Sequence, residues 1–279
     1  MTKRKIKVLL PNVTWWIIAI ILILIFTFPI IGTFLTSLKS NIDISSSPPK
    51  WVFEPTLDHY RNVLYAAGYN FLKFFLNSLI IAFGASIVTI ITTLPAAYTM
   101  VRFRVGKKYF YPFVISLRLI PPILFAIPLF IIYSRVGLID SIFGLILVHS
   151  LMSVSLSLIL FVGFIQDFPP EIEEAGMVDG ATILQIFRLL VIPLLLPSIG
   201  AVAALSFLWS WNEYLFSYIL TFGKSTTVTV GASLFITAWG IRWGDISAAI
   251  FLSIIPTLIF VFFIQRFLVR GLTFGAIKG

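Results

Sequence analysis

Long apolar blocks alternate with short polar segments along this chain of 279 residues. Six blocks are long enough to cross a bilayer, because about 20 apolar residues in a helix span a hydrocarbon core of roughly 30 Å. Lipid offers no hydrogen-bond partner for a bare backbone amide, so each block is predicted to be a helix. The predicted spans cover residues 15–35, 74–100, 109–133, 142–165, 189–216 and 246–264. The pattern predicts an all-α, polytopic protein with six transmembrane helices in a single transmembrane domain over residues 1–279.

The first apolar block could also be read as a secretory signal, because Lys3, Arg4, Lys5 and Lys7 precede it. The apolar core of a signal peptide has about 7–15 residues and is followed by a small-residue cleavage site. The block at residues 15–35 is longer, and no such site follows it. We therefore expect an uncleaved first span.

Basic residues set the expected orientation, since loops rich in Lys and Arg stay in the cytoplasm. If the N-terminus is cytoplasmic, the inner side gathers the first four basic residues together with Arg102, Arg104, Lys107, Lys108 and Arg188. The outer loops, at about 36–73 and 217–245, carry fewer basic residues. Both termini and the loop at about 167–188 are therefore predicted to be cytoplasmic.

Two spans have residues that predict their packing or shape. The third span contains Pro112, Pro121, Pro122 and Pro128, and proline removes amide donors and bends helices, so we expect a kink. The second span carries the small residues Gly84, Ala85, Ser86, Thr89 and Thr93, which suit close packing between helices.

Composition agrees with a membrane protein and excludes several other classes. Hydrophobic residues make up 59% of the chain and charged residues 11%, against roughly 25% charged in soluble proteins. The net charge of +9 follows from the orientation signal, so nucleic acid is not expected as a partner. The chain has no cysteine, and its two histidines are His59 and His149, so neither a disulfide nor a metal site is expected.

One cytoplasmic loop stands out by its acidic residues, which are Asp167, Glu171, Glu173, Glu174 and Asp179. Pro169 and Pro170 suit the first turn of a helix, and acids near that turn complement its dipole. Ile172, Ala175 and Val178 recur at three-residue spacing and predict one apolar face. Gly180 allows a sharp turn, and Asp179, just before it, is expected to cap the helix that follows the turn. A short amphipathic helix of this kind suits docking into a cleft of another protein.

The same loop resembles the EAA loop of ABC-importer permeases. The resemblance rests on Glu174-Ala175-Gly176, then Gly180, then Leu190-Val191-Ile192-Pro193, with Asp179-Gly180-Ala181 in the matching place. Gly176 departs from the alanine usual in the family, and Leu190 departs from the usual isoleucine. Residues 271–279 and Trp211-Asn212-Glu213 are similar to segments of sugar-importer permeases, in particular the smaller permease of maltose-type systems.

This resemblance implies a type I importer permease in the cell (inner or cytoplasmic) membrane. It would form half of the pathway for a sugar or polyol and have no catalytic site or cofactor of its own. The implied partners are a second homologous permease, two copies of an ATP-binding subunit that holds ATP and Mg, and an extracytoplasmic solute-binding protein. The residues implied in coupling to the ATPase are Glu174, Ala175, Gly176, Asp179, Gly180, Ala181 and Pro193.

Gly223-Lys224-Ser225 looks like the end of a P-loop, but Tyr218 stands where the first glycine belongs, so no nucleotide site is expected. Arg118 and Glu213 are candidates for the substrate pathway, since ionisable residues inside spans are functional hypotheses. Asn212 is a candidate because a sugar-facing wall uses amide groups, and for Arg118 a structural ion pair or a position at the interface is the alternative. An interfacial aromatic belt is the alternative explanation for the residues around Glu213.

Other functions stay open at the level of sequence. Permeases for amino acids, phosphate or peptides share the EAA loop. A secondary carrier should show repeated halves and ionisable groups at the midplane, and neither is visible. A membrane-embedded enzyme would need a catalytic constellation, which the scattered acids do not supply. No motif identifies the solute.

Overall fold

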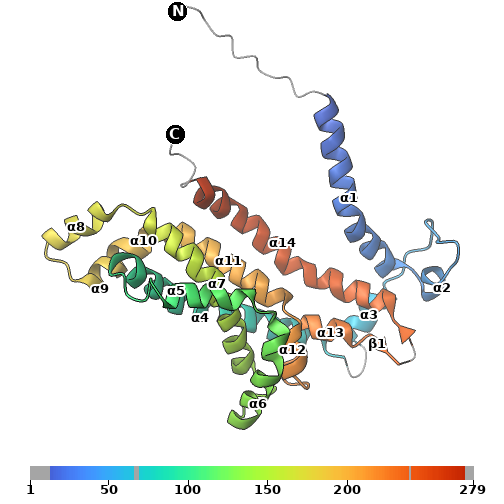
Figure 1. Cartoon of the computed structure of the whole chain (residues 1–279). Coiled ribbons are helices and arrows are strands. Elements are labelled where there is room, and N and C mark those ends of the chain that lie inside the picture. The colour runs from blue at the N-terminus through green and yellow to red at the C-terminus, as the bar shows by residue number, and fades with distance from the viewer. Residues whose placement is uncertain (1–12, 66–68, 239, 274–279) are drawn as a thin grey trace, which may run out of the picture. The chain divides into compact units, whose positions relative to one another are not determined.

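The computed structural model describes residues 13–65, 69–238 and 240–273, with side chains described at 15–65, 69–238 and 240–262. It divides into two units, Met1–Gly68 with Phe235–Leu252 and Tyr69–Leu234 with Ser253–Gly279. Figure 1 shows the helices of both. That the whole chain works as a single transmembrane domain stays a prediction.

The first unit holds a long apolar helix, a largely ordered polar loop and a small hairpin. Its elements are α1 (Val13–Leu38), α2 (Asn41–Ile44), α3 (Asp58–Tyr65), β1 (Ile236–Thr237), β2 (Gly240–Ile241) and the start of α14 (Trp243–Thr273). The strands pair antiparallel, with Ile236 opposite Ile241. Side chains of α1 are exposed on nearly all sides, Phe26 by 73%, as expected for a helix that faces lipid.

A buried polar cluster fastens the loop after α1 to the start of α14. His59 lies with its Nδ1 atom 2.7 Å from the Asp245 carboxylate and its Nε2 atom 2.9 Å from the carbonyl oxygen of Lys39. Arg242 pairs with the other carboxylate oxygen of Asp245 at 2.5 Å. A side chain at Gly244 would overlap the His59 ring, so only glycine leaves room for this arrangement. The external loop predicted at about 36–73 therefore contains ordered structure.

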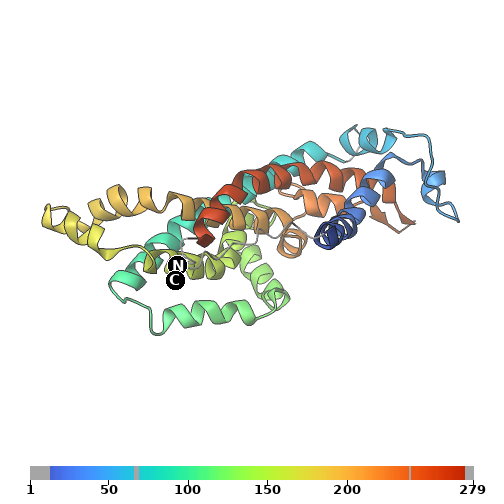
Figure 2. The ribbon, with the colours of Figure 1, turned by 90° about the horizontal axis from the view of Figure 1, so that it is seen from above.

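The second unit contains the remaining helices. These are α4 (Phe71–Arg102), α5 (Phe110–Ser116), η1 (Leu117–Leu119), η2 (Pro122–Phe125), α6 (Ala126–Val136), α7 (Ile142–Gln166), α8 (Pro170–Val178), α9 (Ile183–Ile186), η3 (Phe187–Val191), α10 (Ile192–Leu194), α11 (Leu196–Asn212), α12 (Leu215–Leu220), α13 (Val228–Ser233) and the rest of α14. Here α4 packs along α7, and α11 packs against both (Figure 2).

Small residues let α4 and α7 approach closely, as predicted. Ala85 and Thr89 are fully buried, and the Thr89 hydroxyl donates to the Ser150 carbonyl of α7 at 3.4 Å. A side chain at Gly84 would come within 2.6 Å of Ile146. The larger core cluster, which includes Leu94, Phe161 and Val202, lies where these helices meet.

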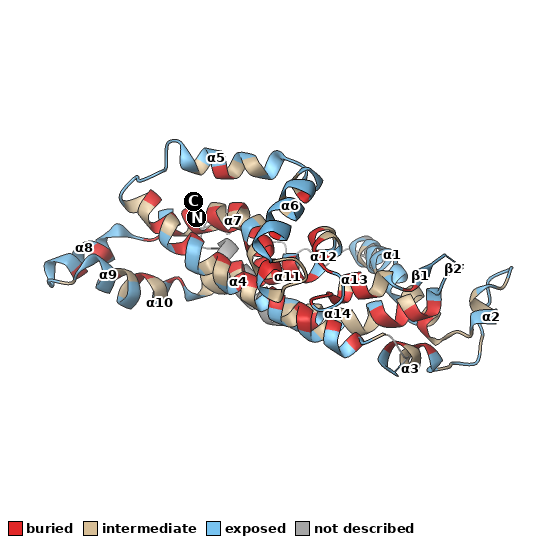
Figure 3. Ribbon diagram, turned by 90° about the horizontal axis from the view of Figure 1, so that it is seen from below, coloured by how far each residue is buried: buried red, intermediate tan, exposed pale blue. Residues whose placement is uncertain are grey.

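The expected kink in the third span is confirmed and is sharp. The helix runs Phe110–Leu119 and Pro122–Val136 meet at 104° (Figure 3). Pro121 and Pro122 lack amide donors, and a residue before proline is pushed toward extended backbone. Ile120 accordingly has φ −82° and ψ 125°. The chain thus turns a corner inside one apolar block.

The fifth span also bends, which the sequence analysis did not predict. The runs Ile183–Leu194 and Leu196–Asn212 meet at 74°. Leu195 has left the helical region, and Pro197 opens the next helix. The span was predicted to continue to residue 216, but α11 ends at Asn212 because Glu213 is extended, with φ −68° and ψ 127°.

Among the described residues, four single helices are long and apolar enough to cross a bilayer, namely Trp15–Leu38, Phe71–Arg102, Ile142–Gln166 and Trp243–Phe262. If each of the two bent pairs crosses as one span, the number rises to six, which is the number of predicted spans. The ends of the predicted spans differ by a few residues.

Candidate functional site

The acidic loop folds as the sequence predicts, into the short helix α8 with Pro170 in its first turn and Glu171 and Glu173 beside it. In Figure 1, α8 and the α9–α10 segment lie together beyond the end of α7. Nine residues make few turns, so the position of α8 depends on how its two ends and its inner face are held.

The C-terminal end of α8 is closed by a left-handed glycine. Gly180 has φ +82°, the Gly180 amide donates to the Met177 carbonyl, and the Ala181 amide donates to the Gly176 carbonyl, both at 3.0 Å. This pair of bonds is the Schellman arrangement, which favours glycine at the left-handed position. The predicted sharp turn at Gly180 is therefore confirmed.

The predicted cap on the next helix is wrong. Asp179 is the C-cap of α8, and Thr182 is the N-cap of α9, which begins at Ile183. The Thr182 hydroxyl accepts from the Gln185 amide, and the Gln185 side chain accepts from the Thr182 amide, which makes a capping box. The turn at Gly180 uses two residues, so Asp179 lies too early in the chain to cap α9.

Most of α8 is exposed (Figure 3), and its exposed residues include the apolar residues of the predicted face together with Glu171 and Glu174. Val178 is 87% exposed and Ile172 is 38% exposed, and Ala175 is exposed between them. The predicted apolar residues of α8 are therefore not covered by the rest of the second unit. An exposed apolar face on a helix this short is characteristic of a surface that binds another molecule.

The opposite face of α8 is fixed by a buried carboxylate. Glu173 is buried, and its two carboxylate oxygens accept from the Arg102 Nε atom and the Tyr98 hydroxyl of α4, each at 2.7 Å. Arg102 also donates to the Phe168 carbonyl at 2.9 Å. The sequence analysis did not distinguish Glu173 from the other acids of the loop, because its partners lie 71 and 75 residues away.

Gly176, the second buried residue of α8, lies against the start of the fifth span. A Cβ atom there would be 2.9 Å from the Leu190 Cδ1 atom and 3.4 Å from Ile186. Gly176 and Leu190 are the two positions that depart from the EAA pattern. They lie next to each other, and the end of the Leu190 side chain would have to shift slightly to admit an alanine at 176.

The structure brings together six of the seven residues predicted to couple to an ATPase. Glu174 and Ala175 lie on α8 beside the buried Gly176, and Asp179, Gly180 and Ala181 form its closing turn. Pro193 lies apart, in α10 at the start of the bent fifth span. Pro193 is itself exposed, but it does not lie on α8.

A cavity of about 360 Å³ opens among the bent third span, α7 and α11. Its polar lining consists of hydroxyls from Ser153, Ser155, Ser157 and Ser206 together with Arg118, and Trp209 contributes an aromatic wall. The Ser153 hydroxyl is buried without a hydrogen-bond partner among the described residues. The sequence analysis missed these serines, although repeated serines in one span were a visible signal.

Of the three pathway candidates, only Arg118 lines this cavity. It sits in η1 at the corner of the third span, is exposed, and has no acidic partner within 4 Å in the described part of the chain. Asn212 is exposed at the end of α11, where its side chain donates to the Leu208 carbonyl of its own helix.

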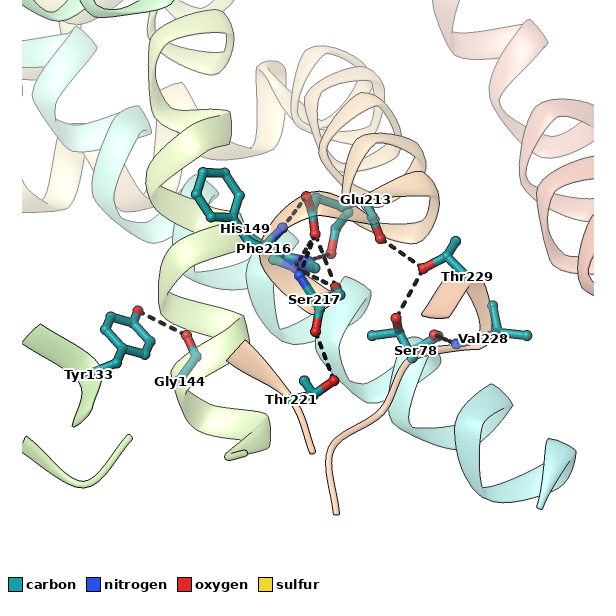
Figure 4. A network of polar contacts seen from close by, with 12 residues as sticks. Ser78, Tyr133, Gly144, His149, Glu213, Phe216, Ser217, Thr221, Val228 and Thr229 are labelled. Carbon is teal, nitrogen blue, oxygen red and sulfur yellow. Dashed lines mark hydrogen bonds and ion pairs between the residues drawn. The ribbon is translucent and has the colours of Figure 1, made fainter. Parts of the chain in front are cut away.

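Glu213 lies in a buried polar network (Figure 4). Its carboxylate lies 3.2 Å from the His149 Nε2 atom and accepts from the Phe216 and Ser217 amides at the start of α12. The other ring nitrogen of His149 is 2.7 Å from the Ser210 hydroxyl. These contacts stabilise the break between α11 and α12, and they hold α7 next to this break through His149.

In the segment that resembled a P-loop, backbone amides donate hydrogen bonds to the Asp140 carboxylate. It accepts from the Lys224 and Ser225 amides at 2.9–3.0 Å. Burial raises the pKa of Asp140, but hydrogen bonds from the Ser225 and Lys224 amides outweigh burial and hold the pKa below its ordinary value. These amides therefore serve a structural role. Among the described residues, no group of three His, Asp or Glu side chains is placed to hold a metal.

The fold and the site together are those of a membrane-embedded subunit with a polar cavity among its spans and a short helix, α8, outside them. Comparison with known proteins identifies the family. Residues 86–274 match the family described as the binding-protein-dependent transport system inner membrane component. The chain belongs to this family. The tail resemblance includes residues 274–279, which lie outside the described residues.

Individual relatives agree. The chain is 31% identical to a diacetylchitobiose uptake system permease of Streptomyces coelicolor, over 96% of each chain. It is 30% identical to a trehalose/maltose transport system permease of Thermococcus litoralis, over 94% of this chain and 95% of that one. A solved bacterial ABC transporter involved in alginate import has the same fold, with a TM-score of 0.75 and 22% identity over 91% of this chain and 95% of that one.

These findings confirm the predicted class. The protein is the permease subunit of an ABC importer and a multi-pass protein of the cell membrane, and ATP hydrolysis belongs to a separate subunit. Membership of the family implies a binding protein, a second permease and an ATPase as partners.

Proposed function

We propose that this permease forms half of the translocation pathway for a sugar or polyol and is coupled through α8 to its ATPase. The observation that carries the coupling role is the exposed apolar face of α8 at Ile172, Ala175 and Val178, on a helix held rigidly from behind by Glu173. A docking surface works only if its own position is fixed, and the Gly180 turn and the Glu173 contacts fix it.

The solute class rests on two observations. Two of the relatives are named for the uptake of oligosaccharides, namely diacetylchitobiose and trehalose or maltose. The cavity itself is lined by serine hydroxyls, an arginine and Trp209, groups that suit a solute with many hydroxyls and an apolar ring face. We propose that Arg118 lies on the pathway, because it lines the cavity. Asn212 and Glu213 remain candidates for the pathway, although neither lines the cavity.

The assembly we propose contains two ATP-binding subunits that hold ATP and Mg, a second homologous permease and an external binding protein. The exposed face of α8 would dock in a cleft of one ATPase copy. Glu174, Ala175, Asp179 and Ala181 would contact the cleft or border it, while Gly176, Gly180 and Pro193 set the shape of the loop.

Orientation is tested by thiol labelling, for which the absence of cysteine provides a clean background. We propose that both termini and α8 are cytoplasmic. Cysteine at the exposed Lys224 should react with an impermeant reagent in intact cells, and cysteine at the exposed Lys108 should react only after permeabilisation. Neither position lies on the proposed docking face. Labelling of Lys108→Cys in intact cells would reverse the topology.

The solute class is tested with the whole complex in proteoliposomes. We expect binding protein loaded with an oligosaccharide or polyol to stimulate ATP hydrolysis several-fold over empty binding protein. Binding protein presented with amino acids, a short peptide or phosphate should give no stimulation. Stimulation by one of these solutes alone would refute the sugar assignment while leaving the coupling role of α8 intact.

A further inference from the structure

We propose that Glu173 is a positioning residue that, with Tyr98 and Arg102, latches α8 to α4 and passes the movement of the docked helix into the membrane. We call Glu173, Tyr98 and Arg102 the α8 latch. This inference rests on the proposed docking of α8 to the ATPase. It adds the contacts through which a movement of the docked helix would be transmitted to the membrane spans.

Both carboxylate oxygens of Glu173 have a hydrogen-bond donor within the latch. Glu173 is 3% exposed, and each of its carboxylate oxygens has its own donor, the Arg102 Nε atom and the Tyr98 hydroxyl, at 2.7 Å. Charge-assisted bonds of this length are about twice as strong as neutral ones. A buried carboxylate is stable only when it is paired in this way, so the pairing fixes one geometry.

Arg102 joins a third segment to the same contact. Its second nitrogen donates to the Phe168 carbonyl at 2.9 Å, and its guanidinium lies 5.9 Å from the centre of the Phe168 ring. Phe168 belongs to the link between α7 and α8. Tyr98 in turn packs its ring 4.9 Å from the Phe187 ring in η3. The end of α4 therefore holds α8 together with the segments before and after it.

In the described part of the chain, no other side chain of α8 makes a hydrogen bond or ion pair with α4. Otherwise the helix connects to the spans through a proline-containing link, the turn at Gly180 and the packing of Gly176 on Leu190. Such connections fix a position less firmly than a buried ion pair does. The latch is thus the firm connection from α8 to α4, and α4 packs along α7 and α11, which line the cavity.

Docking and latching use opposite faces of α8. Val178 and Ala175 are exposed, whereas Glu173 points inward and is covered. The two roles can therefore be separated by mutation. A defect in docking should release the ATPase, and a defect in the latch should leave it bound but poorly coupled.

The test compares Glu173→Gln, Arg102→Met and their double variant with Asp167→Asn as the control. Asp167 is another acid of the same loop, but it is exposed and lies at the end of α7, outside the docking helix. In the full complex, Glu173→Gln should retain the ATPase subunit at wild-type level. Stimulation of ATP hydrolysis by loaded binding protein and solute transport should both fall about tenfold. Asp167→Asn should behave as wild type.

Tyr98→Phe removes one hydrogen bond and keeps the ion pair, so a smaller loss of coupling is expected. The double variant should lose no more than the worse single variant, because both remove the same contact. Full additivity, unchanged coupling in Glu173→Gln, or release of the ATPase subunit by Glu173→Gln would each overturn the latch. If the docking proposal itself fails, Ala175→Asp will also keep the ATPase, so the two failures are distinguishable.

Discussion

Gly180→Val is expected to release the ATPase subunit and abolish transport while the permease is still made and inserted. Gly180 has φ +82°, and no atom lies within 4 Å of where its Cβ would be, so the effect comes from backbone strain alone. Holding a non-glycine residue in such a region costs about 1–3 kcal/mol. Relief of that strain would open the Schellman turn and rotate the face that carries Ala175.

The measurement is co-purification of the ATPase through a tag on this chain, together with solute uptake. Since about 1.4 kcal/mol changes a binding constant tenfold, we expect retention to weaken by about tenfold to a hundredfold. Gly180→Asn is the matched control, because asparagine tolerates the left-handed region far better than valine does. Wild-type retention and transport in Gly180→Val would show that the turn does not position the coupling surface.

Ala175→Asp is expected to have the larger effect on binding. Ala175 is exposed between Ile172 and Val178, so in the free permease a carboxylate there stays in water and the fold should be unaffected. In the docked state the same carboxylate would be buried without a partner, which costs on the order of several kcal/mol. Retention of the ATPase should fall by at least about a hundredfold.

Ala175→Ser serves as the control for Ala175→Asp, because it adds a small polar group without a charge. It should retain the ATPase to within a few-fold of wild type in the same co-purification. Equal retention by the aspartate and serine variants would mean that this face does not enter a dry interface. The coupling assignment would then have to move to another surface.

Local sequence signals predicted most of the fold. The number of spans follows from the lengths of apolar runs, and the corner of the third span follows from Pro121 and Pro122, which remove donors wherever they stand. The turn at Gly180 was predictable for a similar reason, since glycine after a short helix is the residue that tolerates the left-handed region. Each of these features depends on residues within a few positions of one another.

Features that depend on distant contacts were not predictable. Glu173 looked like one acid among five, because its partner Arg102 is 71 residues away. Glu213 was expected at an interface or a pathway wall, and its pairing with His149 became visible only when α7 and α12 were placed. The misassigned cap at Asp179 has a local cause, because the Schellman turn moves the N-cap of α9 to Thr182.

The contact between Gly176 and Leu190 has a consequence for chimeric transporters. Leu190 fills the space that a methyl group at position 176 would take, so the two residues form a matched pair across the loop. A graft that brings only the helix of another permease, with alanine at 176, would require the Leu190 side chain to move. A graft that also carries residue 190 avoids this adjustment, so the natural unit for such a transfer is the loop and not the helix alone.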